Sequence, residues 1–169
     1  MEYISSPWRA EYVKKVFQTK GCVFCNALKS KDPAAAFILY RAEHNFVILN
    51  KYPYTPGHLI IAPLAHLDSL EKASKASSDE LNDIIKLSLS LLRKHYQPHG
   101  FNTGMNLGQS AGAGVIHHYH THVIPRWTGD SNFMPLVGDT KVVIETLDQT
   151  YLQLLPYFQE AKGQRGLMK

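Results

Sequence analysis

Short apolar runs separated by polar turns characterise residues 37–62 of this chain. Residues 37–40 and 46–49 are rich in branched and aromatic side chains, which predicts two strands. Residues 52–57 hold two prolines and a glycine and predict a loop. Residues 58–62 then predict a third strand, and Pro63 ends it. Residues 37–62 are therefore expected to supply three strands of a sheet.

A long amphipathic segment follows the third strand. Ser77 and Glu80 have the spacing of a capping box, which predicts that a helix begins there. Pro98 and Gly100 predict its end. The positions that repeat at helical spacing between these limits are Leu81, Ile84, Ile85, Ser88, Leu91, Leu92 and Tyr96. We interpret this helix as a core-packing element.

The remaining pattern predicts two more strands and a short helix. Residues 101–107 and 116–126 predict the fourth and fifth strands, joined by a glycine-rich connection at 108–114. Residues 9–17 predict a short helix near the start of the chain. Strands on both sides of one long helix favour an α+β domain, with an antiparallel sheet of about five strands covered on one face by that helix.

Composition and charge narrow the class of protein. A chain of 169 residues with 44% hydrophobic content predicts a single globular domain over residues 1–169. The apolar run at 59–65 is far too short to span a membrane, and residues 1–8 lack the features of a signal peptide, so we expect a cytoplasmic protein. The net charge of +4 is carried partly by residues 162–169, which indicates a solvated end rather than a nucleic-acid site.

Three histidines at alternate positions are the most informative feature for function. His118, His120 and His122 would project from one face of the fifth strand, with Cα atoms about 6–7 Å apart. The residues between them would face the other way, as would His117. Three imidazoles packed together purely as core residues would be costly, because each neutral ring needs both a donor and an acceptor. The pattern therefore indicates a chemical role for these histidines rather than a packing role.

Two chemistries fit such a triad. The imidazoles could bind a catalytic zinc ion, or one of them could attack phosphorus and carry the transferred group as a covalent adduct. Gly112, Ala113 and Gly114 lie just before the triad and would let backbone N–H groups approach a phosphate closely. That loop favours phosphorus chemistry, although a plain turn would have a similar sequence.

Cys22 and Cys25 are the only cysteines and form a C-x-x-C pair. In a reducing compartment this spacing is typical of a metal site. Two small buried thiols with no further function would show the same sequence. A redox pair is a third interpretation, although the strand-to-helix context typical of redox motifs does not precede these cysteines. Two thiolates alone do not complete a tetrahedral zinc site, which needs two more ligands.

The motifs together resemble the histidine triad superfamily of nucleotidyl hydrolases and transferases. The resemblance is carried by residues 118–126, by residues 56–63 with Asn50 before them, and by residues 22–25. It covers about residues 20–145, so residues 146–169 would be a C-terminal extension. Residues 106–114 and 125–135 are similar to the bacterial branch that includes diadenosine tetraphosphate phosphorylases. The resemblance implies a histidine-triad-like fold.

The resemblance also implies a role for each site residue. His120 would be the nucleophile, its other ring nitrogen held by the backbone carbonyl of His118, and His122 would contact the α-phosphate. Asn50 would bind the ribose, and His58 would lie near the phosphates or the nucleoside. The residues implied in phosphate binding and in the substrate pocket are Asn106, Gly112, Ala113, Gly114 and, with packing as the competing role, Trp127.

Zinc-bearing relatives imply the missing metal ligands. In this sequence the implied set is Cys22, Cys25, His66 and His118, with His44 as a competing candidate for the third ligand. Four protein ligands leave no open position for water, so this zinc would be structural. It would orient the strand and place a cation close to His120.

The expected function is nucleotidyl transfer, with diadenosine tetraphosphate and phosphate converted to ATP and ADP through a nucleotidyl-histidine intermediate. A dinucleoside polyphosphate hydrolase or nucleoside phosphoramidase would use the same intermediate with water as the acceptor. A nucleotide-binding protein with little turnover is the alternative from another class. The resemblance implies nucleotide substrates and a homodimer, and we expect neither nucleic acid nor a membrane as a partner.

Overall fold

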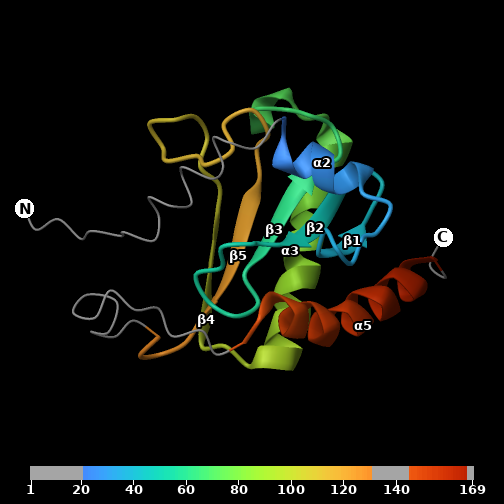
Figure 1. The fold of residues 1–169 in the computed structure, drawn as a ribbon, viewed down its shortest axis with the longest axis vertical. Helices are drawn as coiled ribbons and strands as arrows, with labels where there is room; N and C mark the ends of the chain where they lie inside the picture. Colours follow the sequence, from blue (N-terminus) through green and yellow to red (C-terminus); the bar gives the residue numbers. More distant parts are fainter. Residues whose placement is uncertain (1–20, 131–144, 167–169) are drawn as a thin grey trace, which may run out of the picture.

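An antiparallel five-stranded sheet forms the centre of the molecule (Figure 1). The computed structural model describes residues 21–130 and 145–166, so the predicted helix at 9–17 lies outside the described residues. The sheet has the order β1-β2-β3-β5-β4. Its strands are β1 (Ile38–Arg41), β2 (Asn45–Leu49), β3 (Leu59–Pro63), β4 (Gly100–Gly104) and β5 (Thr121–Arg126). The α+β sheet predicted from the sequence is confirmed.

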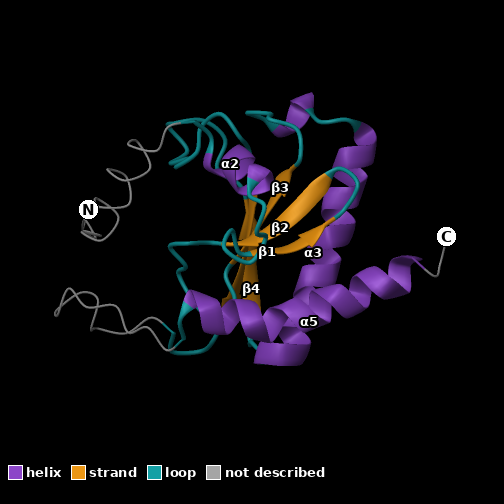
Figure 2. Cartoon of the chain, turned by 45° about the vertical axis from the view of Figure 1, so that its right-hand side comes forward, coloured by secondary structure: helices purple, strands orange, loops and turns teal. Residues whose placement is uncertain are grey.

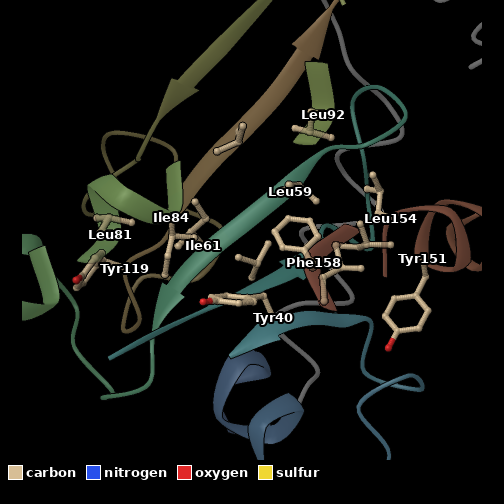
Figure 3. Packing of buried hydrophobic residues seen from close by; sticks show 14 residues of the cluster. Tyr40, Leu59, Ile61, Leu81, Ile84, Leu92, Tyr119, Tyr151, Leu154 and Phe158 are labelled. Carbon is tan, nitrogen blue, oxygen red and sulfur yellow. The ribbon is translucent and has the colours of Figure 1, made fainter. Parts of the chain in front are cut away.

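Two long helices, α3 (Lys75–Tyr96) and α5 (Leu147–Gly166), pack on one face of the sheet (Figure 3). Residues of α5 that were predicted to lie in a C-terminal extension fill part of this core, because Tyr151, Leu154 and Phe158 are buried there. Burying three such side chains stabilises the fold by several kcal/mol, at roughly 1.5–3 kcal/mol for each. Helix α5 is therefore an integral part of the hydrophobic core.

The opposite face of the sheet carries a second, smaller apolar cluster under helix α2 (Val23–Lys29). Phe24 of α2 meets Phe46 of β2 and Ile60 of β3 in this cluster. Figure 2 shows α2 and α3 on opposite sides of the strands. The expectation of a sheet covered on one face is corrected here, because the segment with the two cysteines forms a helix that covers part of the second face.

Helix α3 begins earlier than the sequence predicts. Its N-cap is Ser74, whose hydroxyl oxygen accepts a hydrogen bond from the Ser77 amide at 3.2 Å. Glu80 does not complete a capping box. Its two carboxylate oxygens instead accept hydrogen bonds at 2.9 Å from the backbone amides of Glu43 and His44, so that it ties α3 to the turn between β1 and β2. A short 3₁₀ helix, Leu70–Lys72, precedes α3.

The fifth strand begins later than predicted, at Thr121 rather than at residue 116. His118 and His120 therefore precede β5, and only His122 lies on the strand. The side chains still alternate between the two faces, because the Tyr119 side chain is buried in the core under α3. The backbone here is held by a hydrogen bond of 2.7 Å from the Tyr119 amide to the Leu67 carbonyl. The fourth strand is shorter than predicted and ends at Gly104.

No helix among the described residues is both long and apolar enough to cross a membrane.

The loop between β2 and β3, residues 50–58, presses against α3. Gly57 has a φ of +71°, and a Cβ atom there would lie 2.8 Å from Cε2 of Tyr96. Both the backbone conformation and the space at this position require glycine.

Gly57→Ala should lower the free energy of unfolding by about 1–3 kcal/mol, because alanine is strained at this φ and overpacks against Tyr96. Urea denaturation measures the change. Gly163→Ala is the matched control: nothing lies within 4 Å of a Cβ at that helical position, so stability should stay the same or rise slightly. A Gly57→Ala protein as stable as the parent would contradict the proposed close approach of loop and helix.

Candidate functional site

The candidate site lies on the face of the sheet that carries α2. His122 of β5 pairs with Ile60 of β3, and Ile60 belongs to the apolar cluster under α2. Asn50 directly follows β2 and His58 directly precedes β3. The backbone amide of Asn50 donates to the backbone carbonyl of His58 at 3.1 Å, so the two residues lie side by side. Because side chains alternate along each strand, the same face receives Asn50, His58 and His122. The sheet thus gathers residues from three segments of the chain.

His120 is held in one tautomer by the backbone. Its Nδ1 lies 3.1 Å from the carbonyl oxygen of His118. A carbonyl only accepts, so Nδ1 carries the proton and Nε2 keeps a free lone pair. The side chain is 4% exposed, and this burial lowers the pKa of His120 below its usual value, although the bond to the His118 carbonyl works in the opposite direction. Burial therefore favours a neutral ring with an unprotonated Nε2.

His58 and His122 form a hydrogen-bonded pair whose proton positions follow from their neighbours. The Tyr54 amide donates to Nδ1 of His58 at 3.1 Å, so a neutral His58 carries its proton on Nε2. Nε2 of His58 lies 2.9 Å from Nδ1 of His122 and donates to it. A neutral His122 then carries its own proton on Nε2. Because its ring centroid is 4.9 Å from that of His120, His122 places a donor beside His120.

Asn50 belongs to the same hydrogen-bonded group. Its Nδ2 lies 3.3 and 3.4 Å from the two ring nitrogens of His58, and its Oδ1 accepts from the Tyr52 amide at 2.9 Å. The structure therefore brings together Asn50, His58, His120 and His122. Ribose binding by Asn50 stays a prediction.

The four residues predicted as metal ligands meet in one cluster. The candidate ligand atoms of Cys22, Cys25, His66 and His118 all lie within 4.8 Å of one another. Two of these contacts are 3.3 Å long, from Cys22 Sγ to His118 Nδ1 and from Cys25 Sγ to His66 Nδ1. Ligand atoms around a tetrahedral zinc ion lie about 3.3–3.8 Å apart, given the usual bond lengths. The donor set and the 3.3 Å contacts fit a closed zinc site.

The two cysteines reach this cluster through helix α2. Cys22 is the N-cap of α2, and Cys25 lies in its first turn. Residues three apart in a helix share one side, so both sulfur atoms face the same point. His66, rather than its competitor His44, supplies the third ligand position.

His118 has the hydrogen-bonding pattern of a metal ligand. Its Nε2 lies 2.9 Å from the carbonyl oxygen of Pro63 and donates to it, so Nδ1 keeps a lone pair directed at the sulfur atoms. A carbonyl that accepts a hydrogen bond from the far ring nitrogen is typical of metal-bound histidine. Burial is the largest cause that lowers the pKa of His118, which keeps the ring neutral and able to bind a cation.

Phe24 is a site residue that the sequence reasoning missed. Its ring centroid lies 5.2 Å from that of His118 and 5.0 Å from that of His120. It therefore packs against both His118 of the cysteine–histidine cluster and His120. Its place between the two cysteines was the available signal, but the contacts depend on α2 being a helix.

The glycine-rich connection forms a compact turn of its own. The Gly112 amide donates to the Gln109 carbonyl at 2.9 Å, and the Ala113 amide donates to the Gly108 carbonyl at 3.3 Å. The phosphate-binding roles of this loop and of Asn106 stay predictions.

Trp127 lies away from the histidine group. It follows β5, and its ring meets that of Tyr96 edge to face, with the centroids 6.3 Å apart. Five residues of extended chain separate it from His122, a distance of about 16 Å. Within this chain Trp127 packs against α3, and its role in a substrate pocket stays a prediction.

Comparisons with known sequences identify the family of this chain. The HIT domain family matches residues 31–129. The AP-4-A phosphorylase of Mycobacterium tuberculosis (strain ATCC 25618 / H37Rv) is 39% identical over 113 residues, which are 67% of this chain and 58% of that protein. An uncharacterized HIT-like protein of Saccharolobus solfataricus is 29% identical over 113 residues, 67% of this chain and 79% of that protein. The match to the phosphorylase thus spans little more than half of that relative's length.

Solved structures share the fold. A Zn-bound histidine triad family protein from Mycobacterium smegmatis gives a TM-score of 0.66 at 22% identity and covers 85% of this chain and 97% of its own. A hypothetical histidine triad nucleotide-binding protein from Sulfolobus tokodaii strain7 gives a TM-score of 0.64 at 26% identity, with 85% and 93% covered. Since the matched domain spans more than half of the sequence and contains the histidine site, the chain belongs to the HIT domain family.

Proposed function

We propose that this protein is a nucleotidyl transferase that cleaves dinucleoside polyphosphates through a covalent intermediate on His120. The observation that carries the proposal is the fixed tautomer of His120. Its Nδ1 is bonded to the His118 carbonyl, and its Nε2 lone pair is free in a buried position. A neutral, oriented imidazole is what attack on phosphorus requires.

The reaction follows in two displacements. In the first, Nε2 of His120 attacks the α-phosphorus of diadenosine tetraphosphate, the bond to the bridging oxygen breaks, and ATP leaves. The ring becomes positively charged, and the His118 carbonyl that accepts its Nδ1–H stabilises this charge. In the second, an oxygen of inorganic phosphate attacks the same phosphorus, the bond to Nε2 breaks, and ADP leaves.

His122 would stabilise the phosphorus centre in both steps. The chain of hydrogen bonds from the Tyr54 amide through His58 fixes the proton of His122 on Nε2. A donor there would contact an oxygen of the α-phosphate, where negative charge builds up.

The choice of phosphate as the acceptor is supported by the mycobacterial relative named AP-4-A phosphorylase. A hydrolase or phosphoramidase would pass through the same adduct and use water instead. A nucleotide-binding protein with little turnover is the remaining alternative, and the intact, correctly oriented His120 argues against it.

His120→Ala should abolish the adduct and all turnover, because no other group in the site combines a fixed lone pair with this position. Incubation with diadenosine tetraphosphate, with and without phosphate, followed by product identification and intact-protein mass measurement, tests this. ADP and ATP formed only with phosphate indicate phosphorolysis, whereas AMP formed without phosphate indicates hydrolysis.

His95→Ala is the control for that experiment, because His95 lies at the end of α3 and contacts Gln153 instead of the site. It should form the adduct at the parent rate. Full activity in His120→Ala would contradict the proposed nucleophile, and saturable binding without turnover in the parent would favour the binding-protein alternative.

We also propose that Cys22, Cys25, His66 and His118 hold a structural zinc ion. The ion would supply a fixed positive charge and a cross-link between α2, the segment after β3 and the segment before β5. His118 links this cluster to the nucleophile, since its ring faces the sulfur atoms and its carbonyl holds His120. The zinc would therefore act on the orientation of His120, without contacting substrate.

Protein purified without chelator should contain about one zinc per chain, and Cys22→Ser should lower both the zinc content and the thermal stability, because one of four ligands is lost. Elemental analysis and thermal denaturation measure the two. His44→Ala is the matched control, because His44 lies outside the cluster, and its zinc content should equal that of the parent. Less than half a zinc per chain, unchanged in Cys22→Ser, would contradict the site.

The cytoplasmic location, the homodimer and the lack of nucleic-acid or membrane partners stay predictions from the sequence and the resemblance.

A further inference from the structure

An exposed aromatic ring stands at the rim of the histidine site. The side chain of Tyr54 is 51% exposed although it packs on the buried ring of His58. The two ring centroids are 5.0 Å apart with an angle of 30° between the planes, which is close to a stacked arrangement. The ring of Tyr54 therefore rests on His58 with one side and leaves about half of its surface accessible at the edge of the histidine group.

The loop that carries Tyr54 is held rigidly. Thr55 Oγ1 donates to the Pro125 carbonyl at 2.9 Å, which ties the loop to the end of β5. The His58 amide donates to the Thr55 carbonyl at 3.3 Å, and Gly57 touches α3. Pro53 and Pro56 restrict the backbone further. A ring on such a loop is ordered before any ligand arrives, so a ligand that contacts it loses little conformational entropy.

The backbone of Tyr54 is already part of the site. Its amide fixes the tautomer of His58, and His58 in turn fixes that of His122. The side chain therefore stands at a defined place relative to the donor that would contact the α-phosphate. The His58 ring lies between the two, with its centroid 5.1 Å from that of His122 and 5.0 Å from that of Tyr54. A nucleotide with its α-phosphate at His122 could therefore reach this rim with its base.

We propose that the ring of Tyr54 is a stacking surface for a purine base of the substrate. The proposal rests on the proposed nucleotidyl-transfer function and adds a specificity-determining residue to it. The purine would lie on the solvent side of the Tyr54 ring, so that Tyr54 stacks between the base and His58. Base stacking on an aromatic side chain is sequence-tolerant and strong enough to affect substrate affinity.

Tyr54→Leu and Tyr54→Phe separate stacking from packing. Leucine keeps an apolar contact with His58 but has no aromatic face, whereas phenylalanine keeps the face and loses only the hydroxyl. The KM for diadenosine tetraphosphate should rise roughly 5- to 100-fold in Tyr54→Leu, the range that loss of one base stack gives, with kcat changed less than about threefold. Tyr54→Phe should keep the KM of the parent within about threefold.

Binding measured without turnover gives a second readout. In a His120→Ala background, isothermal titration calorimetry with diadenosine tetraphosphate should show the same loss of affinity for Tyr54→Leu and the same rescue by phenylalanine. Tyr157→Leu is the matched control, because Tyr157 lies on α5, across the sheet from the histidines, and contacts Lys94 and His95. It should leave KM and affinity unchanged.

A substrate with a single base identifies which nucleotide stacks. Adenosine 5′-phosphoimidazolide would adenylate His120 with release of imidazole, so its only base belongs to the transferred nucleotide. If Tyr54→Leu weakens the use of this probe as much as that of diadenosine tetraphosphate, the ring binds the transferred base. If only diadenosine tetraphosphate is affected, the ring binds the base of the leaving nucleotide. Either result supports stacking.

Equal KM and affinity for Tyr54→Leu and the parent would overturn the proposal. So would a Tyr54→Leu protein with lower kcat and unchanged KM, because that result places Tyr54 in a structural role under His58. Failure of the proposed function looks different: the parent then forms no adduct with either substrate, while Tyr54→Leu still weakens the binding of diadenosine tetraphosphate.

Discussion

One residue, His118, connects the two chemical centres of this protein. Its ring donates to the Pro63 carbonyl and turns its free nitrogen toward the cysteines of α2. Its backbone carbonyl fixes the tautomer of His120. The orientation of His120 therefore depends on a residue that is itself held by Pro63 of β3 and by the predicted metal site. A change in the cysteine cluster would therefore reach His120 through the ring and the carbonyl of His118.

The two faces of the sheet differ in the kind of side chains that they bury. The face under α3 and α5 carries the larger of the two apolar clusters. The face under α2 carries a smaller apolar cluster and accommodates the buried polar groups of the site. Burying His58, His118 and His120 would be costly if their nitrogens lacked partners, and each ring has at least one hydrogen bond in the structure. The pairing of these rings both lowers that cost and fixes the protons that the chemistry needs.

Much of this arrangement could be predicted from the sequence because it depends on local patterns. The period of two in the histidine motif predicts a shared face, and this holds even though β5 begins only at Thr121. The cysteine spacing predicts a metal cluster, and the structure brings His66 rather than His44 to it. The contacts of Phe24 and the role of Glu80 could not be predicted. Both depend on tertiary packing: α2 lies over the sheet, and Glu80 binds amides of a distant turn that compete with its own helix N-terminus.

The central claim is that the nucleotidyl group passes through His120, and the stereochemistry at the transferred phosphorus tests it most directly. The substrate is a diadenosine tetraphosphate analogue with a chiral α-phosphorothioate, and the configuration of the nucleotide product is determined after turnover. Two successive in-line displacements each invert the centre, so this account predicts net retention. Net inversion would show a single direct displacement by the acceptor and would contradict the covalent intermediate.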